Sequence, residues 1–387
     1  MGLASAMVMA YGAKQGVQVL QQLNQSQSSP YPQQGQGYGA PPQGQAASYY
    51  QQGAQQQQQA QGGHYQPNYA AAQNTGYNPA YAAAGAAAGA AYAAHGAGQG
   101  AQPTGDVGYI LRTLQTCVVD QNLQAFYPPG SLDSLAHRIA ASGALQRIAS
   151  EWRLPMELAH KIAMLSLFDV VLYLDDSGSM AFEENGSRID DAKMICSRVA
   201  TAASLFDTDG ISVVTMNSPM VGNGITSEAQ ANQLISHIQF SGLTPIGTSL
   251  DQKVLQQYVV GPARANALRK PVLVIAVTDG EPAGEDRYAL VKAVQNAKAA
   301  LQQTRYGPDA LSLEIAQVGN DSKARAFLAE IDSHPSIGGL VDCTSTFEIE
   351  QDEALRTTGI QISPELYLLK LICGGIDVSL DSKDERR

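Results

Sequence analysis

Residues 168–180, FDVVLYLDDSGSM, decide the fold class, because a mostly apolar run passes directly into a polar loop. Apolar runs of this length, bounded by polar loops, are typical of strands that are buried on both faces. Similar runs recur at 211–216 (ISVVTM), 271–277 (PVLVIAV) and 311–318 (LSLEIAQV). These runs, the first of them over 168–174, predict four strands in the interior of a parallel sheet.

Amphipathic stretches separate the four predicted strands. Helices are expected over 188–206, 227–239, 248–259, 286–303 and 322–332, an edge strand over 338–343 and a final helix over 363–373. Buried strands that alternate with helices predict an α/β fold, in which a doubly wound, mostly parallel sheet is flanked by helices. We expect this domain to span residues 166–345.

The chain before this domain has two compositions. Only one of the 59 charged residues, Lys14, precedes Asp106, and the stretch 25–105 consists largely of Gln, Gly, Ala, Tyr and Pro. Such a stretch buries too little apolar surface to offset the entropy of ordering its backbone, which predicts a disordered tail. Residues 1–24 can form a short helix. Apolar residues at three- and four-residue spacing predict a helical subdomain over 106–165, and 346–387 is expected to be a helical extension.

The composition also excludes several classes of protein. The formal net charge of −11 disfavours general binding to nucleic acids, whose backbone is also negative. No apolar stretch reaches the roughly 18 residues expected of a transmembrane helix. The four cysteines lie far apart, without zinc-site spacing, so free thiols and an intracellular, cytoplasmic location are expected.

Oxygen-bearing side chains follow two of the predicted strands. Asp175, Ser177 and Ser179 come directly after the first strand, Asp279 follows the third, and Thr248 lies in the intervening loop GLTPIGTSL. In a doubly wound sheet, ligands bind beyond the carboxyl ends of the strands. Two carboxylates and three hydroxyls form a hard, all-oxygen set suited to Mg²⁺ or Mn²⁺. The sequence therefore predicts a metal site formed by these five residues.

The three motifs D-x-S-x-S, PIGTS and VTDGEP, in this order, resemble the metal-ion-dependent adhesion site of von Willebrand factor A domains. The resemblance covers roughly residues 165–345. It implies that Ser177, Ser179 and Thr248 bind the metal directly, while Asp175 and Asp279 act through water or in alternating roles. It also implies that an open coordination position takes an Asp or Glu of a protein partner. The tail and helical segment are similar to those of uncharacterised intracellular A-domain proteins of fungi.

Six further carboxylates lie in the loops that carry the first and third motifs: Asp176, Glu183, Glu184, Glu281, Glu285 and Asp286. One interpretation is a solvated acidic rim that also places carboxylates near helix N-termini. The other is a rim that repels acidic partners until the metal is bound.

These observations favour a non-enzymatic, metal-dependent protein-binding module, whose low-complexity tail serves self-association or spacing. One alternative is a scaffold that works mainly through its tail. A second is a Mg²⁺-dependent phosphotransferase of the haloacid-dehalogenase type, but its chemistry needs a second carboxylate two residues after Asp175, where this chain has Ser177. A serine nucleophile is disfavoured because G-x-S-x-G and a nearby histidine base are both missing from the motifs.

Overall fold

A computed structural model describes residues 106–207, 209–358 and 361–377, and within them a six-stranded sheet has the order β3-β2-β1-β4-β5-β6. The strands are β1 (Asp169–Leu174), β2 (Ile211–Thr215), β3 (Val221–Ile225), β4 (Val272–Thr278), β5 (Leu311–Gln317) and β6 (Val341–Thr344). All neighbouring pairs are parallel except β2 and β3. The fold is the predicted doubly wound α/β type.

The sequence missed one strand, β3, and the reason is its composition. The segment VGNGI buries only Gly222 and Ile225, and it pairs antiparallel with β2 at the edge of the sheet. No apolar run signals a strand that is half exposed and rich in glycine. By contrast, all seven residues of β4 are buried, as its apolar sequence predicts.

One face of the sheet is covered by helices from three parts of the chain. Those that precede β1 are α5 (Val107–Asp120), η1 (Leu123–Ala125), α6 (Asp133–Ser142), α7 (Ala144–Glu151), α8 (Met156–Ile162) and η2 (Ala163–Leu167). They are joined by α10 (Ser187–Phe206), α11 (Glu228–Ser236), α17 (Pro364–Cys373) and η6 (Gly374–Ile376). Buried side chains of these helices share one hydrophobic core with Leu172 and Ile275 of the sheet. The segment before β1 is therefore packed onto the sheet.

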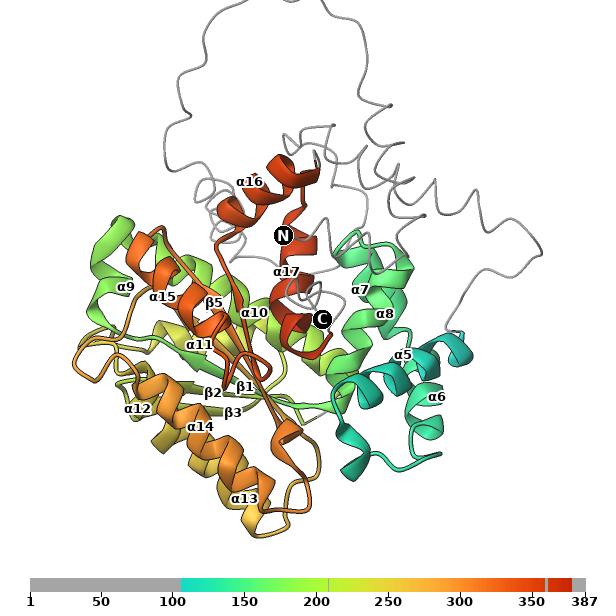
Figure 1. Ribbon diagram of the computed structural model, residues 1–387. Coiled ribbons are helices and arrows are strands. Elements are labelled where there is room, and N and C mark those ends of the chain that lie inside the picture. The colour runs from blue at the N-terminus through green and yellow to red at the C-terminus, as the bar shows by residue number, and fades with distance from the viewer. Residues whose placement is uncertain (1–105, 208, 359–360, 378–387) are drawn as a thin grey trace, which may run out of the picture.

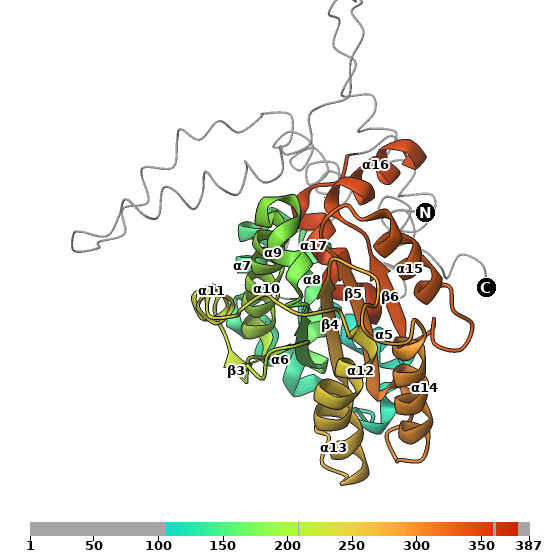
Figure 2. The same ribbon diagram turned by 90° about the vertical axis from the view of Figure 1, so that its left-hand side faces the viewer.

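The other face is covered by a helix that continues through α12 (Ile246–Ser249), the π-helical stretch η4 (Leu250–Val260) and α13 (Gly261–Arg264), together with α14 (Ala289–Gln302) and α15 (Ser322–Asp332). Figures 1 and 2 show the sheet between these helices and the first group. The short elements α9 (Gly178–Phe182), η3 (Glu183–Gly186) and η5 (Pro308–Ala310) lie in connections, and α16 (Phe347–Thr358) leads into α17.

Local chemistry accounts for several helix starts. The side chain of Asp106 accepts hydrogen bonds from the first backbone N–H groups of α5, and Asp321 does the same for α15. Ser363 caps α17, whose first residue is Pro364. These residues satisfy N–H groups that have no partner within the helix, so they set where each helix begins.

The predictions for 1–24 and 25–105 lie outside the described residues, as does the end of the C-terminal extension beyond residue 377. No helix within the described ranges is long and apolar enough to cross a membrane. All four cysteines fall within those ranges and none forms a disulfide, which confirms the predicted free thiols.

Candidate metal site

The predicted metal ligands lie where the direction of winding reverses in the sheet. Strands β1 and β4 are neighbours, but the chain continues from β1 to β2 on one side and from β4 to β5 on the other. Asp175 directly follows β1, and Asp279 directly follows β4. The connections that follow β1 and β4 therefore run in opposite directions along the sheet. Doubly wound sheets bind ligands at the carboxyl ends of two such strands.

The first and second loops of the site are joined by their backbones. Gly178 N–H donates to the carbonyl of Gly242 at 3.2 Å, and Ser241 N–H donates to the carbonyl of Asp176 at 2.7 Å. The loop after β1 is therefore attached to the loop that precedes α12.

The second loop is also joined to the third. Ala283 N–H donates to the carbonyl of Thr244 at 3.0 Å, and the Glu285 carboxylate accepts from the N–H groups of Gly247 and Thr248, both at 2.8 Å. A Cβ at Gly247 would lie 2.1 Å from the backbone nitrogen of Leu290, so only glycine permits this close packing on α14. Thr248 is thus held beside the third loop.

One member of the expected acidic rim is not in it. Asp176 is fully buried, and its carboxylate accepts from the N–H groups of Asn217 and Ser218, both at 2.7 Å, and from Asn217 Nδ2 at 3.1 Å. The prediction of a solvated side chain was wrong here, because the Asp176 carboxylate satisfies backbone N–H groups of the loop after β2 inside the protein.

Asp175 is oriented by two hydrogen bonds inside the protein. Its Oδ1 accepts from Ser177 N–H at 2.9 Å and its Oδ2 accepts from Thr278 Oγ1 at 2.6 Å, while the side chain is 0% exposed. Burial and the neighbouring Asp279 raise the pKa of Asp175 to about 6, although the hydrogen bonds from Thr278 and Ser177 act in the opposite direction. The environment therefore favours a cation or a proton next to this carboxylate.

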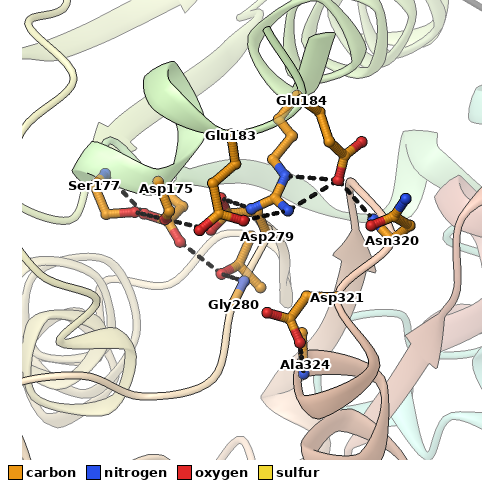
Figure 3. Close-up of polar contacts among 12 residues, drawn as sticks. Asp175, Ser177, Glu183, Glu184, Asp279, Gly280, Asn320, Asp321 and Ala324 are labelled. Atoms are coloured by element: carbon orange, nitrogen blue, oxygen red, sulfur yellow. Dashed lines mark hydrogen bonds and ion pairs between the residues drawn. The ribbon is translucent and has the colours of Figure 1, made fainter. Parts of the chain in front are cut away.

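The other predicted ligands form a continuous chain of contacts. Ser177 Oγ lies 3.0 Å from Ser179 Oγ, which in turn donates to Asp279 Oδ1 at 3.0 Å. Figure 3 shows Asp175, Ser177 and Asp279 gathered at the end of the strands. Thr248 lies exposed on the adjoining loop, and no hydrogen bond between described residues links its hydroxyl to the other four. The structure therefore connects four of the five predicted ligands directly and holds the fifth on a loop attached to theirs.

Arg188 is a member of the site that sequence reasoning missed. Its side chain, 3% exposed, reaches from α10 so that Nη1 contacts Asp279 Oδ2 at 2.6 Å, while Nη2 contacts Glu183 at 2.7 Å and Glu184 at 2.9 Å. Burial acts to lower the pKa of Arg188, but its hydrogen bonds to Asp279 and Glu184 outweigh this and raise it. The guanidinium thus neutralises part of the charge of Asp279.

A partial signal for Arg188 was present in the sequence. Arg188 follows Glu184 by four residues, a spacing at which opposite charges meet on a helix. Its contact with Asp279 spans 91 residues and had no local signal. The contact also needs Gly319, since a Cβ at that glycine would lie 2.4 Å from Arg188 Nε.

The donor set fits a hard divalent cation. Asp175 and Asp279 are both fully buried, and among the described residues Arg188 is the cation that hydrogen-bonds to either of them. Arg188 pairs with Asp279 but not with Asp175, so the two buried carboxylates retain an excess negative charge, which is costly unless a cation or proton compensates it. No group of three or more histidine, cysteine or carboxylate side chains within the described ranges could hold a metal, so a metal here would depend on the hydroxyls.

A scan against protein-family models finds no match to this chain, and a search of curated proteins finds no significant match.

Proposed function

We propose that this protein is a non-enzymatic, divalent-metal-dependent protein-binding module. Mg²⁺ or Mn²⁺ binds to Asp175, Ser177, Ser179, Thr248 and Asp279 in a site that resembles the adhesion site of von Willebrand factor A domains. The observation that carries the proposal is the burial of Asp175 and Asp279, both 0% exposed, where Arg188 pairs with Asp279 and the hydrogen-bond donors to Asp175 are uncharged. A divalent cation compensates this charge with the ligand type it prefers.

The same charges explain why a bound metal would attract an acidic partner. Three of the proposed ligands are neutral hydroxyls, and Arg188 already neutralises part of the charge of Asp279. The cation therefore keeps part of its positive charge, and a carboxylate from another protein is the natural ligand for a remaining coordination position. This is binding chemistry, in which the metal bridges two proteins without a bond being broken.

The phosphotransferase alternative has less support. In this alternative Asp175 would be the nucleophilic carboxylate, and a second carboxylate two residues later would be the general acid. The residue two positions later is Ser177, which cannot act as the general acid that this chemistry requires. The low-complexity tail is proposed to add self-association or spacing, because several weak contacts raise the overall affinity of a metal-bridged contact.

Titration calorimetry with MgCl₂ and MnCl₂ on the full chain tests the proposal. We expect Ser177→Ala and Thr248→Ala to weaken metal binding by at least tenfold, about 1.4 kcal/mol. Their stability in EDTA should stay close to that of the wild type, because the Thr248 side chain is exposed on α12 and Ser177→Ala removes only one hydroxyl. Ser236→Ala, an exposed hydroxyl on α11, is the matched control and should bind the metal normally.

A pull-down in Mg²⁺ and in EDTA, with the wild type and Asp175→Asn, then tests partner binding. Retention of partners only by the wild type in Mg²⁺ is expected. No heat with either ion, or partners that bind equally well in EDTA, would contradict the proposal. Phosphatase activity that disappears in Asp175→Asn would favour the enzyme instead.

A further inference from the structure

Large apolar side chains are exposed on all three loops of the site. Phe182 is 84% exposed, Leu243 is 59% exposed and Tyr288 is 50% exposed. They belong to the loops that carry Ser177, Thr248 and Asp279, respectively. The other exposed large apolar residues of the described ranges are scattered over different elements: Tyr109, Val119, Val221 and Leu355. Each of the three loops of the site therefore carries one exposed large apolar side chain.

Phe182 and Leu243 are fixed on the loops that form the site. The ring of Phe182 lies against Gly178, where an added Cβ would be 3.7 Å from the ring. Leu243 lies between Gly242 and Thr244, the two residues whose carbonyls join the second loop to the first and third. These contacts leave both side chains open to solvent but give them a defined position beside the proposed ligands.

Leu243 also covers the third loop. A Cβ at Gly284, whose φ is +80°, would lie 2.6 Å from Leu243 Cδ1, and the carbonyl of Leu243 accepts from Asn217 Nδ2 at 2.9 Å. Exposed apolar side chains that are held in place in this way mark a surface that gains free energy when a partner covers it.

The charge around the site limits which partners can cover it. Arg188 is shared by Glu183, Glu184 and Asp279, so three negative charges meet one positive charge, and Asp175 adds a further carboxylate. With a divalent cation, the metal, its two carboxylate ligands and Arg188 would remain positive, but Glu183 and Glu184 beside them make the surrounding surface negative. A partner can bring one carboxylate to the metal, but additional carboxylates beside it would be repelled.

We propose that the partner segment recognised by this site is a single aspartate or glutamate flanked by large apolar residues, which pack on Phe182 and Leu243. This inference rests on the metal-dependent function proposed above. The occupant is a segment of another protein. The low-complexity tail cannot supply the carboxylate, because residues 1–105 contain no aspartate or glutamate.

Three fluorescent peptides of equal length test the inference on the full chain. They carry one aspartate between two leucines, between two serines or between two glutamates, and their affinities are measured by fluorescence polarisation in Mg²⁺ and in EDTA. The leucine-flanked peptide should bind at least tenfold more tightly than the serine-flanked one, and the glutamate-flanked peptide should bind most weakly. All Mg²⁺-dependent binding should disappear in EDTA.

Variants connect this preference to the exposed side chains. Phe182→Ser and Leu243→Ser should reduce the preference for leucine over serine flanks to less than threefold, with Mg²⁺ affinity unchanged in calorimetry. Val119→Ser, which removes a comparably exposed apolar side chain from α5, is the matched control and should keep the preference.

The outcomes separate the two proposals. If Mg²⁺ binds but the leucine-flanked peptide binds no better than the serine-flanked one, or not at all at millimolar concentration, the inference is overturned while the metal site stands. If neither ion binds, the proposed function itself fails. Mg²⁺-dependent self-association that Phe182→Ser abolishes, measured by sedimentation, would assign the surface to a second copy of the chain and overturn the inference.

Discussion

Two groups of buried charges lie on the same sheet, and they are compensated differently. The loop site consists of Asp175, Ser177, Ser179, Thr248 and Asp279, with Arg188 beside them. The buried cluster consists of Glu314, Asp342, Glu350 and Lys370, which lie on β5, β6, α16 and α17. Every member of the buried cluster is at most 6% exposed, whereas Thr248 of the loop site is open to solvent.

In the buried cluster, the charged side chains are paired with one another. Glu314 and Asp342 are paired in register on adjacent strands, and a Cβ at Gly374 would lie 3.0 Å from one carboxyl and 2.2 Å from the other. Burial, the charge of Asp342 and a hydrogen bond with Asp342 raise the pKa of Glu314. Two carboxyl groups hydrogen-bond to each other only when one is protonated. Lys370 pairs with Glu350 at 2.8 Å.

The comparison distinguishes carboxylates that are paired with groups of the fold from carboxylates that could be paired with a bound cation. In the buried cluster, Lys370 of α17 pairs with Glu350, and the raised pKa of Glu314 favours its protonated form beside Asp342. In the loop site, Asp175 receives hydrogen bonds from a hydroxyl and a backbone N–H, neither of which carries a charge. No charged donor of the described residues hydrogen-bonds to it, so a proton or, as proposed above, an external cation would compensate its charge.

The largest effect is expected where compensation is internal. Lys370→Met leaves the carboxylate of Glu350, 4% exposed, without its ion-pair partner. The free energy of unfolding, measured with urea, should fall by about 3–5 kcal/mol. Arg147→Met, which breaks an exposed ion pair with Glu151, should cost under about 1 kcal/mol. If the free energy of unfolding fell equally in the two variants, the buried ion pair would contribute no more to stability than the exposed one.

At the loop site, removing the internal cation should strengthen the binding of an external one. Arg188 lies 2.6 Å from Asp279 Oδ2 and would compete with a bound metal for the charge of this carboxylate. Arg188→Met should therefore raise the affinity for Mg²⁺ by about tenfold, or about 1.4 kcal/mol, in titration calorimetry. Arg188→Lys keeps the charge and should stay near the wild type. A loss of affinity in the methionine variant would mean that Arg188 serves to position Asp279.

The smallest effect concerns Asp191 on α10, whose electrostatic neighbours include Glu184 beside the loop site and Glu348 of α16. Burial, followed by the charges of Glu348, Glu184 and Asp190, raises its pKa to about 7. Because the folded-state pKa lies above that of the unfolded chain, the stability linked to this group is present in full below pH about 4 and is lost as pH rises through about 7.

Asp191→Asn should therefore reduce the loss of stability between pH 5 and pH 8 by on the order of 1 kcal/mol, because the amide cannot ionise. Urea unfolding at the two pH values measures the difference. Asp133→Asn, which changes an exposed carboxylate of α6 that is not among the causes of the Asp191 shift, is the control and should leave the pH dependence unchanged. An identical pH dependence in the wild type and Asp191→Asn would contradict the prediction.

The sequence by itself determined the features that depend on local patterns. Apolar runs predicted β1, β2, β4 and β5 to within two residues, because a strand buried on both faces must be apolar along its length. The order of strands and helices then placed the side chains after β1 and β4 at one edge of the sheet. Four of the five predicted ligands are directly linked there.

Only the tertiary structure decided the features that depend on contacts between distant segments. Asp176 is buried by the loop after β2, Arg188 meets Asp279 across 91 residues, and Leu243 covers Gly284. Sequence patterns report which side of its own helix or strand a residue occupies, but the partner of a charged or exposed side chain depends on how the loops pack together. The compensation of charge, which distinguishes the loop site from the buried cluster, is therefore a property of the folded chain.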